Sequence, residues 1–408
     1  MQRRHFLASL AGAGLMLPLG ASAWAATGSA PSRQKLIVVL LRGAADGLNI
    51  VAPVGDPAYA ALRPEIGLKP EDGFKLDSLY VMHPALAPLQ SWWQAGKLAF
   101  VHASGSPDIT RSHFDAQDYM ESGTPGVKTT QDGWLNRLAT ALPGADTPNR
   151  ILSVGPVMPR IVAGGTPAMN LPNGAAATRP TPLDRPAIGN AFDALYAQNA
   201  RLGKTYRDGK TAHQEVLAAA AGMATAEMQA ADRGAPLPNG FPDDAARLAG
   251  LMRQDARIQF GFFALGGWDT HANQGAGTGQ LAQRLAPLAQ GLDVLARRLG
   301  PLFQDTAIVV MSEFGRTARQ NGNAGTDHGH GNVMWLLGGG IQGGKVHGEF
   351  PGLDSNALYE GRDLAVTTDF RLVLAQLASR HLQLPDAALA RVFPQLPSGN
   401  VPEIWRSV

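Results

Sequence analysis

The chain has 408 residues, 45% of them hydrophobic, and a formal charge of only +2 at neutral pH. This composition supports one large α/β domain with insertions, or two domains. The near balance of charge gives no case for binding nucleic acid or an anionic membrane surface. The chain contains no cysteine, which excludes disulfides, a thiol nucleophile, a cysteine-bound zinc and an iron–sulfur cluster.

Residues 1–25 have the features of a twin-arginine export signal. Arg3 and Arg4 precede an apolar run, and small residues surround the expected cleavage positions, Ala23 and Ala25. A membrane anchor is the alternative, but glycines and a proline interrupt the short apolar run, so it would span a bilayer poorly. Cleavage would remove two arginines and no acidic residue, which brings the formal charge to zero. We therefore expect a periplasmic or secreted protein with no stable membrane anchor after cleavage.

Strands and helices alternate along the chain after a flexible lead-in at residues 26–34. Continuous apolar runs of strand length predict strands at residues 35–41, 98–102, 151–154, 258–265 and 308–311. Helical spacing of apolar residues predicts helices at residues 83–95, 112–121, 190–232, 277–303, after 243–244 and from 367. This alternation predicts an α/β fold in which helices cover both faces of a mostly parallel sheet.

No linker forces a domain boundary, so we expect a single domain over residues 35–408. The segment at 162–186 is rich in proline, glycine and alanine and is predicted to be an irregular surface excursion. Together with the helical stretch that follows it, this segment predicts a cap or insertion at about residues 155–240.

Polar loops follow four of the apolar strands, and on a parallel sheet such loops meet at one edge. Their carboxylates and imidazoles are ligands for divalent metals, and the histidines favour Zn²⁺ or Mn²⁺ over Mg²⁺ or Ca²⁺. The candidate metal ligands are Asp46, Asp269, His271, Glu313, Asp327, His328 and His330. For any single loop, a hydrogen-bonded turn is the alternative.

Two further residues are candidates for catalysis. Ser112 lies at the expected start of a helix, where its hydroxyl could be a metal-activated nucleophile beside backbone N–H groups that bind an anion. Serine is also a preferred N-cap residue, and Asp115 three residues later favours that structural role. Arg316 is placed to bind a transferring anion, or to pair with Glu313 three residues before it.

Four motifs in this order, LRGAADGLNIVAP, RSHFDAQDYMESG, GGWDTHANQ and SEFGRTARQNGNAGTDHGHGN, resemble the bacterial domain-of-unknown-function family 1501. That family is in turn similar to the alkaline phosphatase and sulfatase superfamily, which implies a three-layer α/β/α sandwich with one or two metals at the strand ends.

The resemblance also implies roles for individual residues. Asp46 would be the first-strand metal ligand, Ser112 would stand near the nucleophile, and Asp269 with His271 would hold a metal after a middle strand. Glu313 would replace the usual Asp-His pair. His328 or His330 would supply the last histidine.

Three functions follow as hypotheses. The first is an exported metal-dependent hydrolase that acts on a small anionic substrate, a phosphate or sulfate ester. The second is a non-catalytic periplasmic binding or assembly protein that uses the same polar edge to hold a ligand or a partner protein. The third is an oxidoreductase subunit, which is disfavoured because the glycines at 338–340 and 343–344 lack the spacing of a dinucleotide-binding loop.

Overall fold

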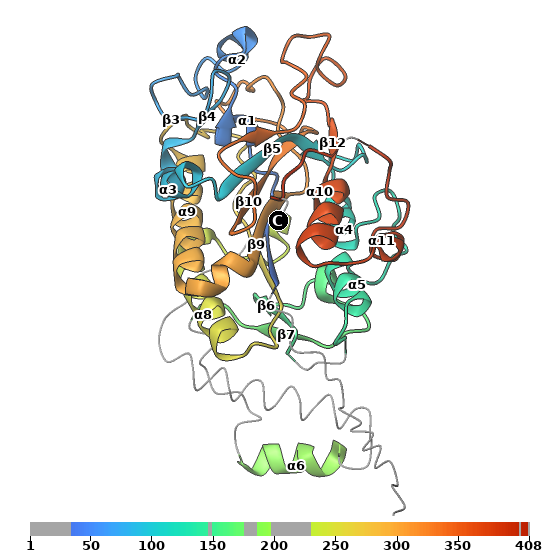
Figure 1. Ribbon diagram of the computed structural model, residues 1–408. Coiled ribbons are helices and arrows are strands. Elements are labelled where there is room, and N and C mark those ends of the chain that lie inside the picture. The colour runs from blue at the N-terminus through green and yellow to red at the C-terminus, as the bar shows by residue number, and fades with distance from the viewer. Residues whose placement is uncertain (1–33, 146–148, 175–185, 197–229, 400, 407–408) are drawn as a thin grey trace, which may run out of the picture. The chain divides into compact units, whose positions relative to one another are not determined.

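A nine-stranded sheet lies at the centre of the part of the chain that the computed structural model describes, residues 34–145, 149–174, 186–196, 230–399 and 401–406. The strands are β1 (Lys35–Leu41), β5 (Leu98–Gly105), β6 (Ile151–Val154), β7 (Ala168–Leu171), β8 (Phe260–Leu265), β9 (Thr306–Ser312), β10 (Asn332–Gly338), β11 (Val346–His347) and β12 (Thr368–Asp369). They run in the order β11–β5–β10–β9–β1–β8–β6–β7, with β12 paired to β5 (Figure 1). Only β10 is antiparallel to its neighbours, β5 and β9.

Strand β1 lies between β8 and β9, and Val38 is in register with Phe262 on one side and Val309 on the other. All of its residues are buried. Because successive side chains of a strand point to opposite faces, alternate residues of β1 enter two separate hydrophobic cores. Ile37, Val39 and Leu41 belong to one core, whereas Leu36, Val38 and Leu40 belong to the other.

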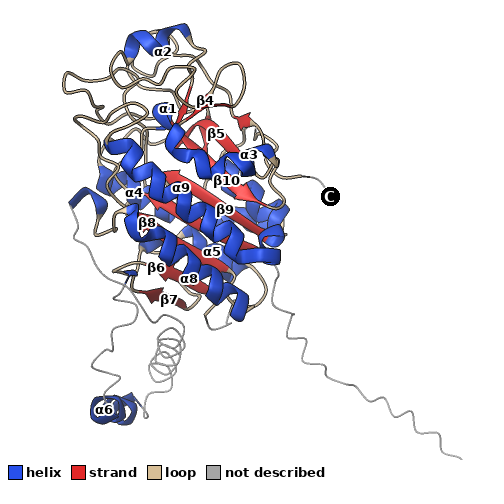
Figure 2. Cartoon of the chain, turned by 90° about the vertical axis from the view of Figure 1, so that its left-hand side faces the viewer, coloured by secondary structure: helices blue, strands red, loops and turns tan. Residues whose placement is uncertain are grey.

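Helices cover both faces of this sheet. The helices α8 (Phe241–Gln254) and α9 (Gln280–Leu299) contribute to the core on one face. The helices α5 (Trp134–Ala141), α10 (Phe370–Gln376) and α11 (Asp386–Val392) contribute to the core on the other face (Figures 1 and 2). The predicted α/β class with a mostly parallel central sheet is therefore confirmed.

The spacing of leucines explains why α9 covers the sheet. These residues recur every three or four positions and all are buried: Leu281, Leu285, Leu288, Leu292, Leu295 and Leu299. At 3.6 residues per turn this spacing forms one apolar stripe. The helix starts three residues later than predicted and ends at Leu299, before a 3₁₀ segment, Gly300–Asp305.

Shorter elements complete the described fold. A second sheet pairs β2 (Val51–Ala52) and β3 (Phe74–Lys75) with β4 (Val81–Met82). The remaining α-helices are α1 (Gly47–Ile50), α2 (Pro57–Leu62), α3 (Gln90–Gln94), α4 (His113–Ser122) and α6 (Pro186–Tyr196). Besides Gly300–Asp305, five short segments of the described ranges are 3₁₀ or π-helical: Pro84–Leu89, Arg160–Val162, Ala230–Asp232, Pro238–Gly240 and Leu377–His381.

Two element predictions differ from the structure. The helix predicted at 83–95 is a 3₁₀ segment, Pro84–Leu89, followed by α3, because Pro88 has no N–H to continue an α-helical ladder. The segment at 162–186 is not wholly irregular, since it contains β7. The sequence of β7, AMNL, is mostly half-buried and lacks a continuous apolar run.

Several predictions fall on residues outside the described ranges. These are the export signal at 1–25, nearly all of the lead-in at 26–34, residues 175–185 of the predicted surface excursion, and residues 197–229 within the predicted helix and cap. The described residues all belong to one compact unit, Pro31–Val408. None of the helices in the described ranges combines the length and the apolar content that crossing a membrane requires.

Candidate metal centre

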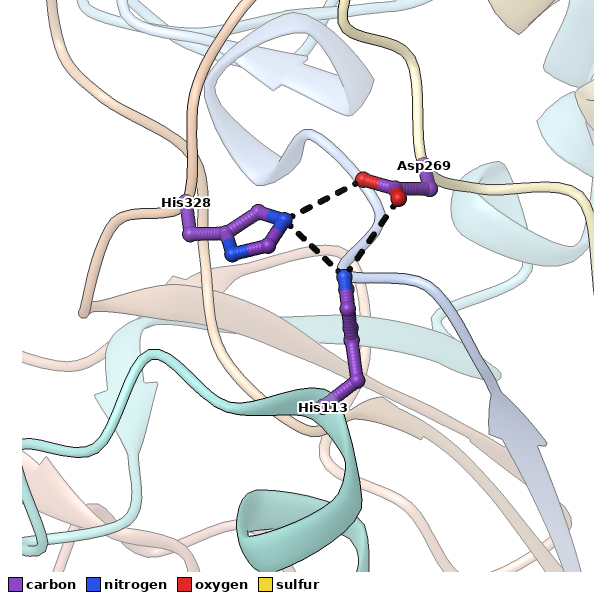
Figure 3. A group of neighbouring side chains, drawn as sticks. All are labelled: His113, Asp269 and His328. Carbon is purple, nitrogen blue, oxygen red and sulfur yellow. Dashed lines mark hydrogen bonds and ion pairs between the residues drawn. The ribbon is translucent and has the colours of Figure 1, made fainter. Parts of the chain in front are cut away.

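Three side chains from distant parts of the chain converge beyond the ends of β5, β8 and β9. One ligand atom each of His113, Asp269 and His328 lies within 4.8 Å of the other two (Figure 3). The Nε2 atoms of His113 and His328 are 2.9 Å apart. The two carboxylate oxygens of Asp269 lie 3.5 Å from Nε2 of His113 and 3.3 Å from Nε2 of His328. The three groups therefore face a common point.

Local structure places each of these side chains. The Ser112 side chain accepts a hydrogen bond from the Asp115 amide as the N-cap of α4, which makes His113 the first residue of that helix. Asp269 follows β8 after a turn through Gly267, whose φ of +87° lies in the left-handed region. His328 is held by a β-bridge to Arg316 in the loop that follows β9.

A close approach between two loops requires a glycine at position 43. A Cβ on Gly43 would lie 2.8 Å from the backbone nitrogen of Asp269, and its φ is +113°. Glycine therefore lets the loop after β1 pack directly against the loop that carries Asp269.

The hydrogen-bond partners of the two histidines assign their tautomers. Nδ1 of His113 lies 2.8 Å from a carboxylate oxygen of Glu313, and Nδ1 of His328 lies 2.9 Å from the Arg111 carbonyl. Both partners are acceptors, so each Nδ1 carries a proton and each neutral ring has its lone pair on Nε2. When both rings are neutral, two lone pairs face each other at 2.9 Å. A cation between them satisfies both.

A third imidazole adjoins this group. Nε2 of His271 lies 2.9 Å from Asp269 and 3.1 Å from Nε2 of His328, and its Nδ1 lies 3.4 Å from Asp327. The His271 side chain is 46% exposed, whereas that of His113 is 9% exposed. His271 therefore forms the solvent side of the cluster, and it can serve as a fourth ligand or border an open coordination position.

The separations of these atoms fit a small ion. A tetrahedral zinc with bonds of about 2.0 to 2.2 Å holds its ligand atoms about 3.3 to 3.6 Å apart. The Asp269 separations of 3.3 and 3.5 Å fall in this range, and the His113–His328 pair at 2.9 Å needs to widen slightly. The donors are ring nitrogens and a carboxylate, which are usual ligands of zinc or manganese. The Nδ1 atoms of His113 and His328 are hydrogen-bonded, as the outer nitrogens of metal-binding histidines usually are.

The charges of the cluster also favour a cation. The pKa of Asp269 is lowered, since hydrogen bonds to His113 and His328 and the charge of Arg316 outweigh the opposing effect of burial. Burial likewise opposes but does not prevent a lowered pKa for Glu313, which His113 stabilises. Burial lowers the pKa of His113, but hydrogen bonds to Asp269 and Glu313 raise it to about 9. Without a metal Nε2 therefore carries a proton at neutral pH, and a bound ion would replace that proton. Two ionised carboxylates thus stabilise positive charge at this point.

Arg316 lies differently from the expectation that it binds an anion. Its guanidinium donates to the carbonyls of Ala44, Gly43, Trp268 and Thr326 and to the carboxylate of Asp269 at 2.5 Å. The side chain is completely buried. All of its nitrogens are therefore engaged, and Arg316 positions Asp269 instead of facing a substrate. It is not paired with Glu313.

Glu313 and Asp327 contact histidines of the cluster instead of lying where the ligand atoms of His113, Asp269 and His328 meet. Glu313 accepts hydrogen bonds from His113, Gln117 and the Gly43 amide, and it is buried. Asp327 contacts His271 and Asn321. Both carboxylates were expected to be metal ligands, but the structure places them behind the imidazoles, where they orient the rings.

Asp46 and His330 are not brought to the cluster. Asp46 is fully buried and accepts from Arg63 at 2.6 Å and from Gln274 at 2.7 Å, so its charge is neutralised by a structural ion pair. His330 bonds the Ser106 carbonyl, and burial lowers its pKa. Ser112 is exposed beside His113 and caps α4.

His113 lies in one of the four polar loops predicted to meet at the edge of the sheet, but it was not among the predicted metal ligands. The signal was present, because His113 directly follows the predicted N-cap Ser112 and so begins a helix beyond the end of a strand. Arg111 was also not selected, since it acts through its backbone carbonyl.

The fold and this cluster define an α/β protein with a candidate metal centre at the carboxyl edge of its sheet. The chain belongs to the family described as "Protein of unknown function (DUF1501)", whose model matches residues 91–393. The predicted family is therefore confirmed. No curated protein matches the chain in sequence.

Solved structures with some similarity include the following three. The C-terminal periplasmic domain of EcEptC from Escherichia coli, in complex with Zn, is 9% identical with a TM-score of 0.36, over 75% of this chain and 72% of that one. A protein in the alkaline phosphatase superfamily from Vibrio parahaemolyticus is 13% identical with a TM-score of 0.34, over 78% and 62%. The PsFucS1 sulfatase from Pseudoalteromonas sp. is 12% identical with a TM-score of 0.36, over 90% and 69%.

Proposed function

We propose that this protein is a metal-dependent hydrolase of phosphate or sulfate esters. The observation that supports it is the convergence of His113, His328 and Asp269, with the Nε2 atoms of both imidazoles directed at one point. Hydrolysis adds water across the P–O or S–O bond and yields an alcohol and the free anion. A bound divalent ion supplies Lewis acidity for the oxygen of the phosphoryl or sulfuryl group.

The residues around the centre divide into ligands and positioning groups. His113, Asp269 and His328 would hold the ion, with His271 as the exposed additional donor. Glu313 and the Arg111 carbonyl fix the protons on the outer ring nitrogens, and Arg316 fixes Asp269. Nitrogen and carboxylate donors without sulfur favour Zn²⁺ or Mn²⁺.

Ser112 is the proposed nucleophile. Its side chain is exposed, and Ser112 directly precedes His113. Its Oγ accepts the Asp115 amide at 3.4 Å, a long bond that leaves a further lone pair for attack.

A second function also has a supporting observation. Arg316, which hydrogen-bonds the ligand candidate Asp269, has all of its nitrogens engaged, so it cannot clamp a transferring anion. A non-catalytic periplasmic protein that holds a ligand or a partner protein at this edge would need no such clamp.

Metal analysis followed by an ester panel separates the two functions. We expect the purified protein to contain close to one zinc or manganese and to turn over aryl phosphates, phosphodiesters or aryl sulfates. Asp269→Asn and His328→Gln should each lose the metal and the activity. His347→Gln is the matched control, since His347 lies outside the cluster and bonds the Gln342 carbonyl.

Metal content, ester turnover and melting temperature together distinguish the two proposed functions. Bound metal without turnover of any ester supports the binding protein. A metal-free protein whose melting temperature does not respond to zinc contradicts both the centre and the hydrolase. Because a bound ion stabilises only the folded state, zinc should raise the melting temperature of the parent protein and leave that of Asp269→Asn unchanged.

We also propose export by the twin-arginine pathway, on the basis of Arg3, Arg4 and the small residues near Ala23 and Ala25. The expected periplasmic product has an amino terminus close to residue 24 or 26. Replacement of both arginines by lysine should retain the full-length chain in the cytoplasm. A chain exported equally well after that change would contradict this route.

A further inference from the structure

We propose that the cavity beside the metal centre binds the organic part of the substrate, and that this part carries a second acidic group recognised by Arg319. The inference about ester substrates depends on the proposed hydrolase, whereas the inference about binding an acidic aromatic or aliphatic group does not. The proposed metal centre assigns no role to this cavity.

The cavity has a volume of about 470 Å³, which lies in the range of small-molecule sites. Three segments form its walls: helix α2, the loop at 317–327 and the loop at 353–362. Leu62, Leu353 and Leu358 give it an apolar wall. Such a surface suits a ring or a short branched chain better than a bare anion.

Two contacts join the cavity to the metal centre. Asp327 lines the cavity and its carboxylate lies 3.4 Å from Nδ1 of His271. Arg362 also lines the cavity, and its guanidinium donates to the carbonyl of the metal-ligand candidate His328 at 3.0 Å. An ester bound at the centre can therefore extend its organic group into the cavity.

Most charged groups of the lining already have partners. Arg362 pairs with Asp363 as well as bonding His328, and Asp327 accepts from Asn321. Asp354 accepts from the amides of Asn356 and Ala357. The amides of Gln320 and Asn321 are likewise occupied by Glu65 and His271.

Arg319 differs from these groups. Its side chain is exposed and lines the cavity, and within the described ranges no hydrogen bond or ion pair engages its guanidinium. An arginine presents a planar set of donors that matches a carboxylate, sulfate or phosphate. An apolar wall with one available guanidinium at its edge selects an apolar group that ends in an acid.

Direct binding tests this without any turnover. We would titrate the purified protein with 4-hydroxybenzoate and with 4-hydroxybenzamide and measure both dissociation constants by ligand-observed NMR. The benzoate should bind about fivefold more tightly, as expected for an exposed charge pair. The preference should vanish in Arg319→Gln. It should persist in Arg253→Gln, which removes an exposed arginine from α8, outside the cavity lining.

A second pair of variants tests the cavity as the binding place. Ala61 and Ala60 are both exposed on α2, but only Ala61 lines the cavity. Ala61→Trp should therefore weaken the binding of both probes at least tenfold, while Ala60→Trp leaves it unchanged. Equal effects of the two variants, or a benzoate preference that survives Arg319→Gln, would overturn the inference.

Assays with two esters distinguish the proposed substrate cavity from the proposed hydrolase activity. We expect kcat/KM for 4-carboxyphenyl phosphate or sulfate to exceed that of the 4-carbamoylphenyl ester, with the ratio again lost in Arg319→Gln. Selective benzoate binding without turnover of any ester supports the cavity and contradicts the hydrolase. Turnover of both esters with equal efficiency by the parent and by Arg319→Gln contradicts the cavity and supports the hydrolase.

Discussion

Nδ1 of His113 lies 2.8 Å from the buried carboxylate of Glu313, which follows it by 200 residues in the chain. The same oxygen accepts from the Gly43 amide and from Gln117, so the position of the acceptor is fixed from three sides. This arrangement holds the His113 ring with its Nε2 towards Asp269 and His328.

Glu313→Gln is therefore expected to weaken metal binding about 10- to 100-fold. The amide has the same shape but can turn its NH₂ group towards Nδ1, which would favour the wrong ring tautomer. Zinc affinity is measured by competition with a chromophoric chelator. Asp293→Asn, which removes a remote carboxylate that pairs with Arg297 on α9, is the control. An unchanged affinity in Glu313→Gln would remove this carboxylate from the centre.

Ser112→Asn separates the two roles of Ser112. Asparagine caps helices as well as serine does, so the free energy of unfolding should change by less than about 1 kcal/mol. Ester turnover should fall at least 100-fold if the hydroxyl is the nucleophile. Urea unfolding and steady-state kinetics on one preparation give both values. Full activity in this variant would assign Ser112 to capping alone.

Arg316→Lys should destabilise the protein by about 3 kcal/mol, because several buried carbonyls lose their donor and the lysine cannot reach them all. Asp269 loses its anchor in the same change, so zinc affinity should fall as well. Arg298→Lys, at the exposed end of α9, is the matched substitution. A loss below about 1 kcal/mol by urea unfolding would show that the carbonyls find other donors.

His102 should make stability depend on pH. Its Nε2 donates to the Val51 carbonyl and its Nδ1 accepts from the Ala103 amide, so the buried ring is neutral and has no site for a second proton. Burial lowers its pKa from 6.5 to about 4. The unfolded chain therefore binds the proton first, and the contribution to stability is full above pH 6.5 and declines as the pH falls towards 4.

Between pH 7 and pH 5 this group should account for a loss of about 2 kcal/mol in unfolding free energy. His102→Gln keeps a donor for the Val51 carbonyl and removes the titration, so its stability should depend less on pH by that amount. Urea unfolding of both proteins across this range provides the comparison. Parallel pH profiles would mean that His102 does not titrate on unfolding.

Local sequence patterns were sufficient for the framework of the fold. The apolar runs of β1, β6, β8 and β9 are buried on both faces, and a parallel sheet with helices on both sides accounts for such runs. The same reasoning placed Asp269, His271 and His328 at one edge, where the structure brings them together.

The remaining parts of the site depend on contacts between distant residues. His113 joins the cluster because α4 packs next to the loop after β9. No local periodicity of the sequence predicts this packing. Asp46 was predicted to bind the metal because it follows a strand, but its carboxylate forms an ion pair with the buried Arg63. Arg316 appeared available because its partners are backbone carbonyls, and a sequence does not show which carbonyls need donors.

The separation of His113 and His328 by 215 residues has a consequence for folding kinetics. Closing so long a loop is slow, and the ligand atoms meet only after β5, β8 and β9 have joined one sheet. The metal site is thus expected to be absent from early folding intermediates. Zinc uptake during refolding would then report the last step of sheet assembly, and added zinc would slow unfolding without accelerating folding.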